Sequence, residues 1–350
     1  MKKFVCRAVR KLYVQSVIDA ACGKGKRLCY KKLAVLFAAV LFFAFASVAA
    51  TYAAEAKFPK RPINLYIPYP PGGFIDLTCR ALGEAAGKVL GQPLIPINRP
   101  GASGTLAATM LKTMEPDGYN IAVSAGSIFY LPAQEDVSFD PLKDFTYICR
   151  TTDSSIGILV RSDSPWKTLK EFLTYAKANP GKIKYGTASP RGPLGMAMAD
   201  LGIKEGIRWN VVPFSGGNEA VAALLGKHVN AICQGPEYIP HVESGELRLL
   251  ALIGDQRFKR FPNVPTFKEL GYVPHLVATG IIGPAGLPKD VIDKLDDAFK
   301  KALADPKVQK VMDDTGSPTV YQNSQQYTAW ARTAVAAYAD LVKRVGLAKK

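Results

Sequence analysis

The hydrophobic pattern near residue 70 changes abruptly from that of a strand to that of a helix. Leu65–Ile67 is a short apolar run typical of a buried strand, and the prolines that follow end it because proline cannot donate to a sheet ladder. After Gly72-Gly73, apolar residues recur at helical spacing from Ile75 to Leu90. The pattern therefore predicts a strand, a glycine turn and a helix.

A turn of this kind directs free backbone N–H groups toward one point, at the positive end of the helix dipole, which suits an anion. The glycines lack the spacing of a dinucleotide fingerprint, and no GKS or GKT follows them. An ordinary strand-to-helix turn is the alternative. Asp76 would repel an anion, so we interpret it as support for the loop, paired with Arg80 one turn later.

The same alternation of strand and helix continues along the chain. The first set has strands at 94–97 and 119–124, a helix at 104–114 and a small-residue loop at 125–129. The second set has strands at 158–160, 183–185, 211–214, 229–233 and 247–253, and helices at 168–178, from about 194, and at 219–225. Helices at 291–303, 307–313 and 324–344 end the chain. Alternation of this kind predicts parallel sheets with helices on both faces, and ligands bind at the carboxyl ends of such strands.

The N-terminal region has the pattern of a secretory signal peptide. Lys31 and Lys32 precede the apolar run 33–48, which is short for a membrane span and ends in small residues. Cleavage sites are predicted after Ala56 and, as a second candidate, after Ala49. We expect residues 1–56 to be a leader, and a misassigned start is our preferred reading of the long stretch before the apolar run.

Removing this leader lowers the net charge of the chain. The whole chain carries a formal net charge of +16, but residues 1–56 hold ten Lys and Arg and two Asp and Glu, which leaves 35 basic and 27 acidic residues, a net charge of +8. No concentrated basic stripe suggests nucleic acid. The cysteines that remain are Cys79, Cys149 and Cys233; their spacing fits no zinc motif, and we expect them to be buried inside helices or strands.

The sequence offers no positive evidence for catalysis. It has three histidines without a matching nucleophile, no G-x-S-x-G elbow and no HExxH motif. We therefore expect no catalytic residues, no metal site and no cofactor. A secreted α/β hydrolytic enzyme remains the alternative from a different functional class.

The sequence resembles the solute-binding proteins of tripartite tricarboxylate transporters, the Bug family, in ten segments that follow one another in the order and spacing typical of that family. They are YPPGGFID (69–76), INRPGASGTLAA (97–108), PDGYNIAVS (116–124), FDPLKDF (139–145), SPWKTLKEF (164–172), ANPGKIKYGT (178–187), VPFSGGNEAVAALLGKHVNA (212–231), GELRLLAL (245–252), VPTFKELGY (264–272) and GPAGLP (283–288). Each segment is weakly specific alone, and together they run through nearly all of the mature chain.

The resemblance implies an α/β protein with the type II periplasmic binding-protein fold, in which two lobes close on a ligand in a cleft. Lobe one would span 57–156 plus 278–350 and lobe two 157–277, with a hinge near Ser155 and Ala278. The implied protein is a periplasmic monomer that delivers a small carboxylate to a membrane transporter. A ligand-sensing protein that serves a signalling receptor is a further alternative.

The family's carboxylate site implies that Pro71, Gly72, Gly73 and Phe74 hold the ligand here, in agreement with the anion site expected from the turn. Loops at the other strand ends add candidates: Ser127, Phe129, Thr187, Ser189, Arg191, Phe214, Ser215 and Gly216. The three phenylalanines indicate a ligand with an apolar or aromatic body, although core packing explains such positions equally well.

One loop departs from the family pattern. In GTASPRGPLGMAM, Gly195 replaces a usual histidine and Pro193 a usual serine. The return segment 278–286 also lacks the tryptophan that the family tends to carry. The common ligands of the family are therefore in doubt for this chain. Arg191 is either a solvated loop residue or a partner of a ligand carboxylate, because arginine suits bidentate carboxylate contacts.

Overall fold

A computed structural model describes residues 58–275 and 277–349 of the chain, and these residues form two separate mixed sheets. The leader expected at 1–56 lies outside the described residues, together with its three cysteines. The α/β class predicted from the sequence is confirmed.

The first sheet has six strands in the order β11-β4-β10-β3-β1-β2. Their bounds are β1 Ile63–Ile67, β2 Leu94–Asn98, β3 Asn120–Ser124, β4 Phe145–Thr152, β10 Thr279–Pro284 and β11 Thr319–Gln322. β1 pairs in parallel with both β2 and β3. β10 runs antiparallel to β3 and β4, and β11 runs antiparallel to β4. The prediction of a parallel sheet was thus correct for β1–β3 and wrong for the sheet as a whole, because the chain returns late to insert β10.

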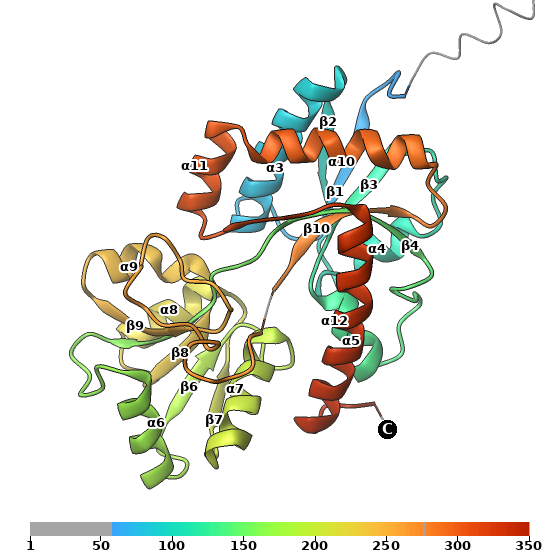
Figure 1. Cartoon of the computed structure of the whole chain (residues 1–350). Helices are drawn as coiled ribbons and strands as arrows, with labels where there is room; N and C mark the ends of the chain where they lie inside the picture. Colours follow the sequence, from blue (N-terminus) through green and yellow to red (C-terminus); the bar gives the residue numbers. More distant parts are fainter. Residues whose placement is uncertain (1–57, 276, 350) are drawn as a thin grey trace, which may run out of the picture. The chain divides into compact units, whose positions relative to one another are not determined.

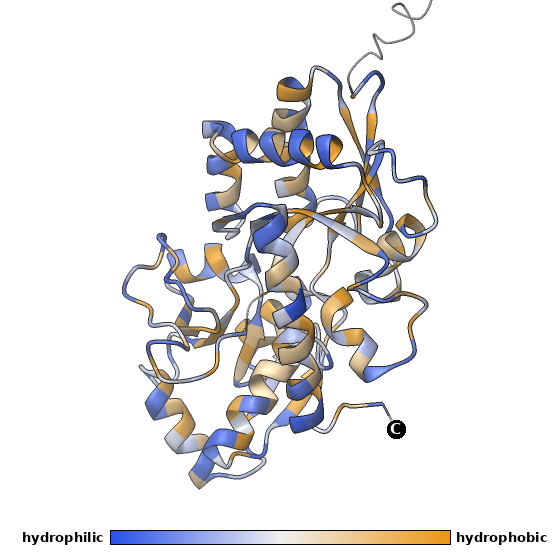
Figure 2. Ribbon diagram, turned by 45° about the vertical axis from the view of Figure 1, so that its right-hand side comes forward, coloured by the Kyte–Doolittle hydropathy of each residue, from blue (hydrophilic) through white to orange (hydrophobic). Residues whose placement is uncertain are grey.

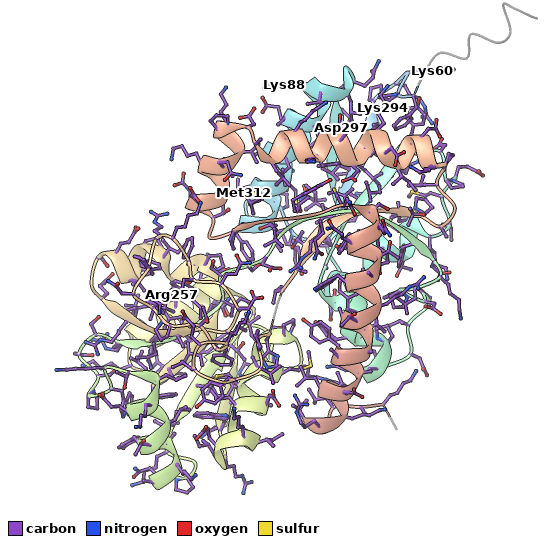
Figure 3. The ribbon with its side chains drawn as sticks, viewed as in Figure 1. Lys60, Lys88, Arg257, Lys294, Asp297 and Met312 are labelled. Atoms are coloured by element: carbon purple, nitrogen blue, oxygen red, sulfur yellow. The ribbon has the colours of Figure 1, made fainter. Side chains whose placement is uncertain are left out.

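Helices from both ends of the chain cover this sheet (Figure 1). Their bounds are α3 Phe74–Leu90, α4 Leu106–Leu111 after the 3-10 turn η1 Ala102–Gly104, α5 Ser127–Gln134, α10 Lys289–Leu303, α11 Pro306–Asp314 and α12 Ser324–Arg344. α10 and α11 pack on α3, and α12 packs on α5 and β4. Figure 2 shows that these helices carry both hydrophilic and hydrophobic residues, and Met312, labelled in Figure 3, is a buried hydrophobic residue of α11.

The second sheet has five strands in the order β7-β6-β8-β5-β9. Its strands are β5 Gly157–Arg161, β6 Lys184–Thr187, β7 Asn210–Pro213, β8 Ala231–Gln234 and β9 Leu247–Leu252; its helices are α6 Leu169–Ala178, α7 Pro193–Glu205, α8 Gly217–Leu225, the 3-10 turn η2 Pro236–Tyr238 and α9 Ile239–Glu243. β6 pairs in parallel with β7 and β8, while β5 is antiparallel to β8 and β9. The same correction from parallel to mixed applies here.

Helix α12 is fixed by its cap and by one tight contact. Asn323 and Gln326 form a capping box at its start. Tyr327 is fully buried, and its hydroxyl lies 2.6 Å from Ser124 Oγ. Gly280 in β10 is required beneath this ring, since a Cβ there would lie 2.5 Å from it. The helix predicted at 324–344 is confirmed, with the same bounds.

Several other elements differ from the sequence-based expectation. Residues 127–134 form a helix rather than a loop, and the helix expected at 104–114 is a 3-10 turn followed by the short α4. β4 and β11 were not predicted at all. β4 is buried along nearly all of its length and β11 is a four-residue edge strand, so neither shows the clean polar alternation of a half-buried strand.

The three cysteines described by the structure are free and buried: Cys79 in α3, Cys149 in β4 and Cys233 in β8. Burial raises the pKa of the Cys79 and Cys233 thiols to about 12. The interpretation as apolar core positions is confirmed. Among the described residues, no helix combines the length and the apolar character that crossing a membrane requires.

Candidate functional site

The loops that follow the parallel strands of each sheet hold most of the predicted site residues. Loops after β1, β2 and β3 leave one edge of the six-stranded sheet, and loops after β6, β7 and β8 leave one edge of the five-stranded sheet. Carboxyl ends of parallel strands are where α/β sheets bind ligands.

Asp76 organises the loop after β1. Its side chain is buried and accepts hydrogen bonds from the Gly72 N–H at 2.9 Å, from Arg80 Nε at 2.9 Å and from Asn98 Nδ2 at 2.7 Å. Asn98 also donates to the Tyr69 carbonyl at 2.9 Å. Burial alone would raise the pKa of Asp76, but these donors outweigh it and hold the pKa below its usual value. The interpretation of Asp76 as loop support is confirmed.

This network restricts which N–H groups can meet an anion. The Gly72 N–H is already bound to Asp76, so it is not part of a free anion cradle. Gly73 is the N-cap of α3, and no side chain caps this 17-residue helix. Pro71, Gly72 and Gly73 are exposed and Phe74 is half-buried. The anion-binding capacity of the turn therefore rests on the first N–H groups of α3, starting at Gly73.

A second loop lies beside the first. Ala102 and Ser103 both have positive φ angles, which non-glycine residues rarely adopt, so residues 101–104 form a sharply turned segment. A Cβ on Gly104 would lie 3.4 Å from both Tyr69 Oη and Ser127 Oγ. Gly104 thus allows the loops after β1, β2 and β3 to converge.

Two hydroxyl groups, those of Ser127 and Tyr69, lie where these three loops converge. Ser127 Oγ is buried and has no hydrogen-bond partner in the part of the chain that the structure describes. Burial raises the pKa of Tyr69 to about 12, so its hydroxyl keeps its proton and can donate at neutral pH. A buried polar group normally has a partner, so Ser127 Oγ is a candidate hydrogen-bond donor to a ligand.

Residues of the second sheet's loops approach α5 directly. The Gln134 side chain donates to the Arg191 carbonyl at 2.8 Å. A Cβ on Gly192 would lie 3.0 Å from Tyr130 Oη and would overlap Ser189 Oγ. Burial raises the pKa of Tyr130 as well, so it stays protonated. The loop after β6 therefore lies against α5, the helix that begins at Ser127.

The loop after β8 adds a carboxylate. Gln234 is buried; its Oε1 accepts from the Ala188 N–H at 3.3 Å and its Nε2 donates to Glu237 at 3.3 Å. A Cβ on Gly217, the first residue of α8, would lie 2.5 Å from the Glu237 carboxyl carbon. The Glu237 carboxylate is therefore packed at the N-terminus of α8, where the helix dipole favours it.

Two of the predicted aromatic residues pack against other parts of the fold. Phe129 is 1% exposed, stacks with Tyr147 and meets Trp330 edge-on, because residue 129 belongs to α5 rather than to a loop. The Phe214 ring covers Gly186, where a Cβ would lie 2.6 Å from it. Core packing explains Phe129, whereas Phe214 is half-buried against the core of the second sheet. Phe74 is the half-buried first residue of α3, directly after the loop that follows β1.

The remaining predicted residues occupy the loops after β6 and β7. Thr187 is buried, and its Oγ1 accepts from the Ser189 N–H at 3.3 Å. Arg191 is exposed, and its guanidinium has no ion-pair or hydrogen-bond partner among the described residues. The exposed Ser215 donates its N–H to Glu219 at 3.0 Å, and Gly216 is the N-cap of α8.

The structure explains the unusual residue at the start of α7. A Cβ on Gly195 would overlap the carbonyl of Pro190, and the Gly195 N–H donates to the Ser189 carbonyl at 3.1 Å. The loop folds back over the helix so tightly that no side chain fits at this position. A histidine here, as expected for the family, would require a different loop.

Sequence reasoning missed Tyr69, Gly104, Tyr130, Gln134 and Glu237. Tyr69 and Gly104 lie inside the quoted family segments but looked like ordinary loop residues. Tyr130 and Gln134 follow the loop that was predicted at 125–129, and no element was predicted for them. Glu237 lies in a stretch without a motif. The described residues contain no group of His, Cys, Asp and Glu side chains suited to a metal ion.

Solved structures define the class of protein. Over 82% of this chain and 100% of the other, it is similar to a TctC solute-binding protein from Polaromonas, with 31% sequence identity and a TM-score of 0.73. It is similar to the periplasmic binding protein BugD, with 29% identity, a TM-score of 0.71 and coverage of 84% and 100%. MatC from Rhodopseudomonas palustris, with bound malate, is 26% identical with a TM-score of 0.67 and coverage of 81% and 100%. The fold is that of periplasmic solute-binding proteins.

The family follows from the sequence comparisons. Residues 78–347 match the family model described as tripartite tricarboxylate transporter family receptor. The chain is 41% identical to the "UPF0065 protein in gbd 5'region" of Cupriavidus necator over 84% of this chain and 90% of the relative. It is 28% identical to protein BugT of Bordetella pertussis, with coverage of 87% and 95%. The chain belongs to the TctC family of solute-binding receptors, which confirms the resemblance and the prediction of a binding protein rather than an enzyme.

Proposed function

We propose that this receptor captures a small carboxylate between the loops of its two sheets and delivers it, as a monomer, to a membrane transporter. The carboxylate would lie at the N-terminus of α3, at Gly73 and Phe74, with Ser127 and Tyr69 donating from one side. Ser189 and Arg191 would approach from the loop after β6, and the exposed Ser215 and the half-buried Gly216 from the loop after β7. MatC, a relative with bound malate, supports this class of ligand.

The observation that carries the proposal is the Ser127 hydroxyl, which is buried and unpaired among the described residues at the point where the loops after β1, β2 and β3 converge. A carboxylate oxygen supplies the acceptor that Ser127 lacks and the negative charge that the helix terminus favours. Asp76 completes the arrangement, because it fixes the loop by the Gly72 N–H and leaves the later N–H groups for the ligand.

We further propose that residues 57–156 with 278–350 and residues 157–277 are the two lobes. Strands β4 and β10 belong to the first sheet, and β5 and β9 to the second, so the chain crosses between the sheets at 153–156 and 253–278. The Ser155 N–H donates to the Gly316 carbonyl at 2.9 Å, and the Tyr238 hydroxyl donates to the Ser155 carbonyl at 3.0 Å. Ser155 thus connects both sides and would mark the hinge together with Ala278.

A thermal-shift screen of mono-, di- and tricarboxylates, aromatic acids included, tests the function. We expect at least one carboxylate to raise the melting temperature of the mature protein, because a ligand that binds only the folded state stabilises it by mass action. The compound should be recovered unchanged after incubation. Turnover of the compound would favour a hydrolytic enzyme, and a screen without any stabilising carboxylate would contradict the proposed ligand class.

The proposed location in the periplasm requires cleavage of the N-terminal leader. We expect the exported protein to begin at Lys57 or at Ala50, since the residues before each have the small side chains that signal peptidase sites need. The intact mass of protein from a periplasmic extract measures this directly. A mature form that keeps the apolar run 33–48 would instead indicate a membrane-anchored receptor.

A further inference from the structure

Glu237 is a carboxylate without a cationic partner among the described residues, and it lies next to the proposed ligand site. It is half-buried, and the bond that it accepts from Gln234 engages Oε2. A Cβ on Gly235 would lie 2.9 Å from Glu237 Oε2 and 3.7 Å from Phe74 Cε1. The carboxylate and the Phe74 ring are therefore both within 4 Å of one point, on the side of the ring toward the second sheet.

The position of Glu237 determines which charges can approach it. The carboxylate already occupies the N-terminus of α8, so this helix end cannot hold an anion of the ligand. Glu219 adds a second negative charge to the same region, where it accepts the Ser215 N–H at 3.0 Å. A ligand carboxylate placed here would be repelled, whereas a hydroxyl or ammonium group would gain an acceptor.

We infer that Glu237 selects a ligand with a carboxylate at one end and a hydrogen-bond donor, an ammonium or a hydroxyl group, at the other. This inference rests on the proposed function, because the first carboxylate is the one at the start of α3. The apolar body of the ligand lies along Phe74, and its donor end reaches Glu237. Dicarboxylates of the same length bind less tightly, because their second carboxylate meets a fixed negative charge.

A matched ligand series separates these contributions. Butyrate, 4-hydroxybutyrate, 4-aminobutyrate and succinate differ only at the distal end, and a six-carbon series with the same ends covers a longer site. Isothermal titration calorimetry on the mature protein should give affinities at least about tenfold higher for the ligands with a donor than for succinate and butyrate, the range expected for hydrogen bonds to charged groups.

Three variants assign the preference to Glu237. Glu237→Gln keeps the size and an acceptor oxygen, so the packing at α8 is retained; it should weaken the 4-amino ligand about tenfold or more and strengthen succinate. Arg191→Ala removes a proposed contact of the shared carboxylate and should weaken all four ligands alike. Glu84→Gln makes the same charge change on the exposed surface of α3, where Glu84 pairs with Lys88, and should change none of them.

The outcomes distinguish this inference from the proposed function. If carboxylates bind, but succinate binds the parent as tightly as the ligands with a donor and Glu237→Gln changes neither, the role of Glu237 is refuted and the carboxylate site stands. If no member of either series and no other carboxylate binds, the proposed function fails, and the inference fails with it. Circular dichroism of each variant confirms that a lost affinity is not a lost fold.

Discussion

Gly73→Val should abolish ligand-induced thermal stabilisation while the protein keeps its native far-UV circular dichroism. Gly73 has φ −73° and ψ 161°, an extended conformation that valine adopts readily. A Cβ at this position would meet only the Pro70 carbonyl, at an ordinary contact distance of 3.8 Å. The fold therefore has room for a side chain, but the isopropyl group would stand where a carboxylate must approach the first N–H groups of α3.

A smaller substitution at the same position and a control at a distant position make this result specific. Gly73→Ala adds a single methyl group and should weaken binding less than Gly73→Val. Ala285→Val adds the bulk of valine at an exposed loop position after β10, away from the site loops, and should leave binding unchanged. If Gly73→Val binds the best ligand as tightly as the parent, the carboxylate lies elsewhere and residues 71–74 form an ordinary turn.

Asp76→Ala should lower the free energy of unfolding by about 2–4 kcal/mol, because it leaves Arg80, Asn98 and the Gly72 N–H without their shared acceptor. Urea denaturation at pH 7 measures the loss. Binding should weaken as well, since the loop that presents Gly73 is no longer held. A stability equal to the parent's would show that Asp76 is dispensable for the loop.

The same variant makes a prediction about pH. The pKa of Asp76 is lowered in the folded protein, so its contribution is complete above the pKa of an unfolded aspartate, about 3.9, and is lost as the pH falls through the folded value. The difference in stability between parent and Asp76→Ala should therefore stay constant from pH 7 down to about pH 4 and shrink only as the pH falls further. Glu84→Gln, which removes an exposed ion pair, should change stability little at any pH.

The prediction of local structure succeeded where the signals lie within one stretch of sequence. The strand, glycine turn and helix at 63–90 depend on proline, glycine and apolar spacing within one stretch, and so does the pairing of Asp76 with Arg80 one turn later. These features were read correctly. The prediction failed for the loop expected at 125–129, because its small residues are typical of a loop although α5 already begins at Ser127.

The sequence by itself determined the alternation of strands and helices, the burial of Cys79, Cys149 and Cys233, and the family. Only the tertiary structure decided where each loop residue lies and what it contacts. Phe129 and Phe214 could not be assigned to core or ligand from spacing, because their partners, Trp330 and Gly186, are far away in sequence. The hydroxyl of Ser127 likewise lies where three separate loops meet, and Glu237 lies near Phe74 although the two are more than a hundred residues apart in sequence. No local pattern encodes either proximity.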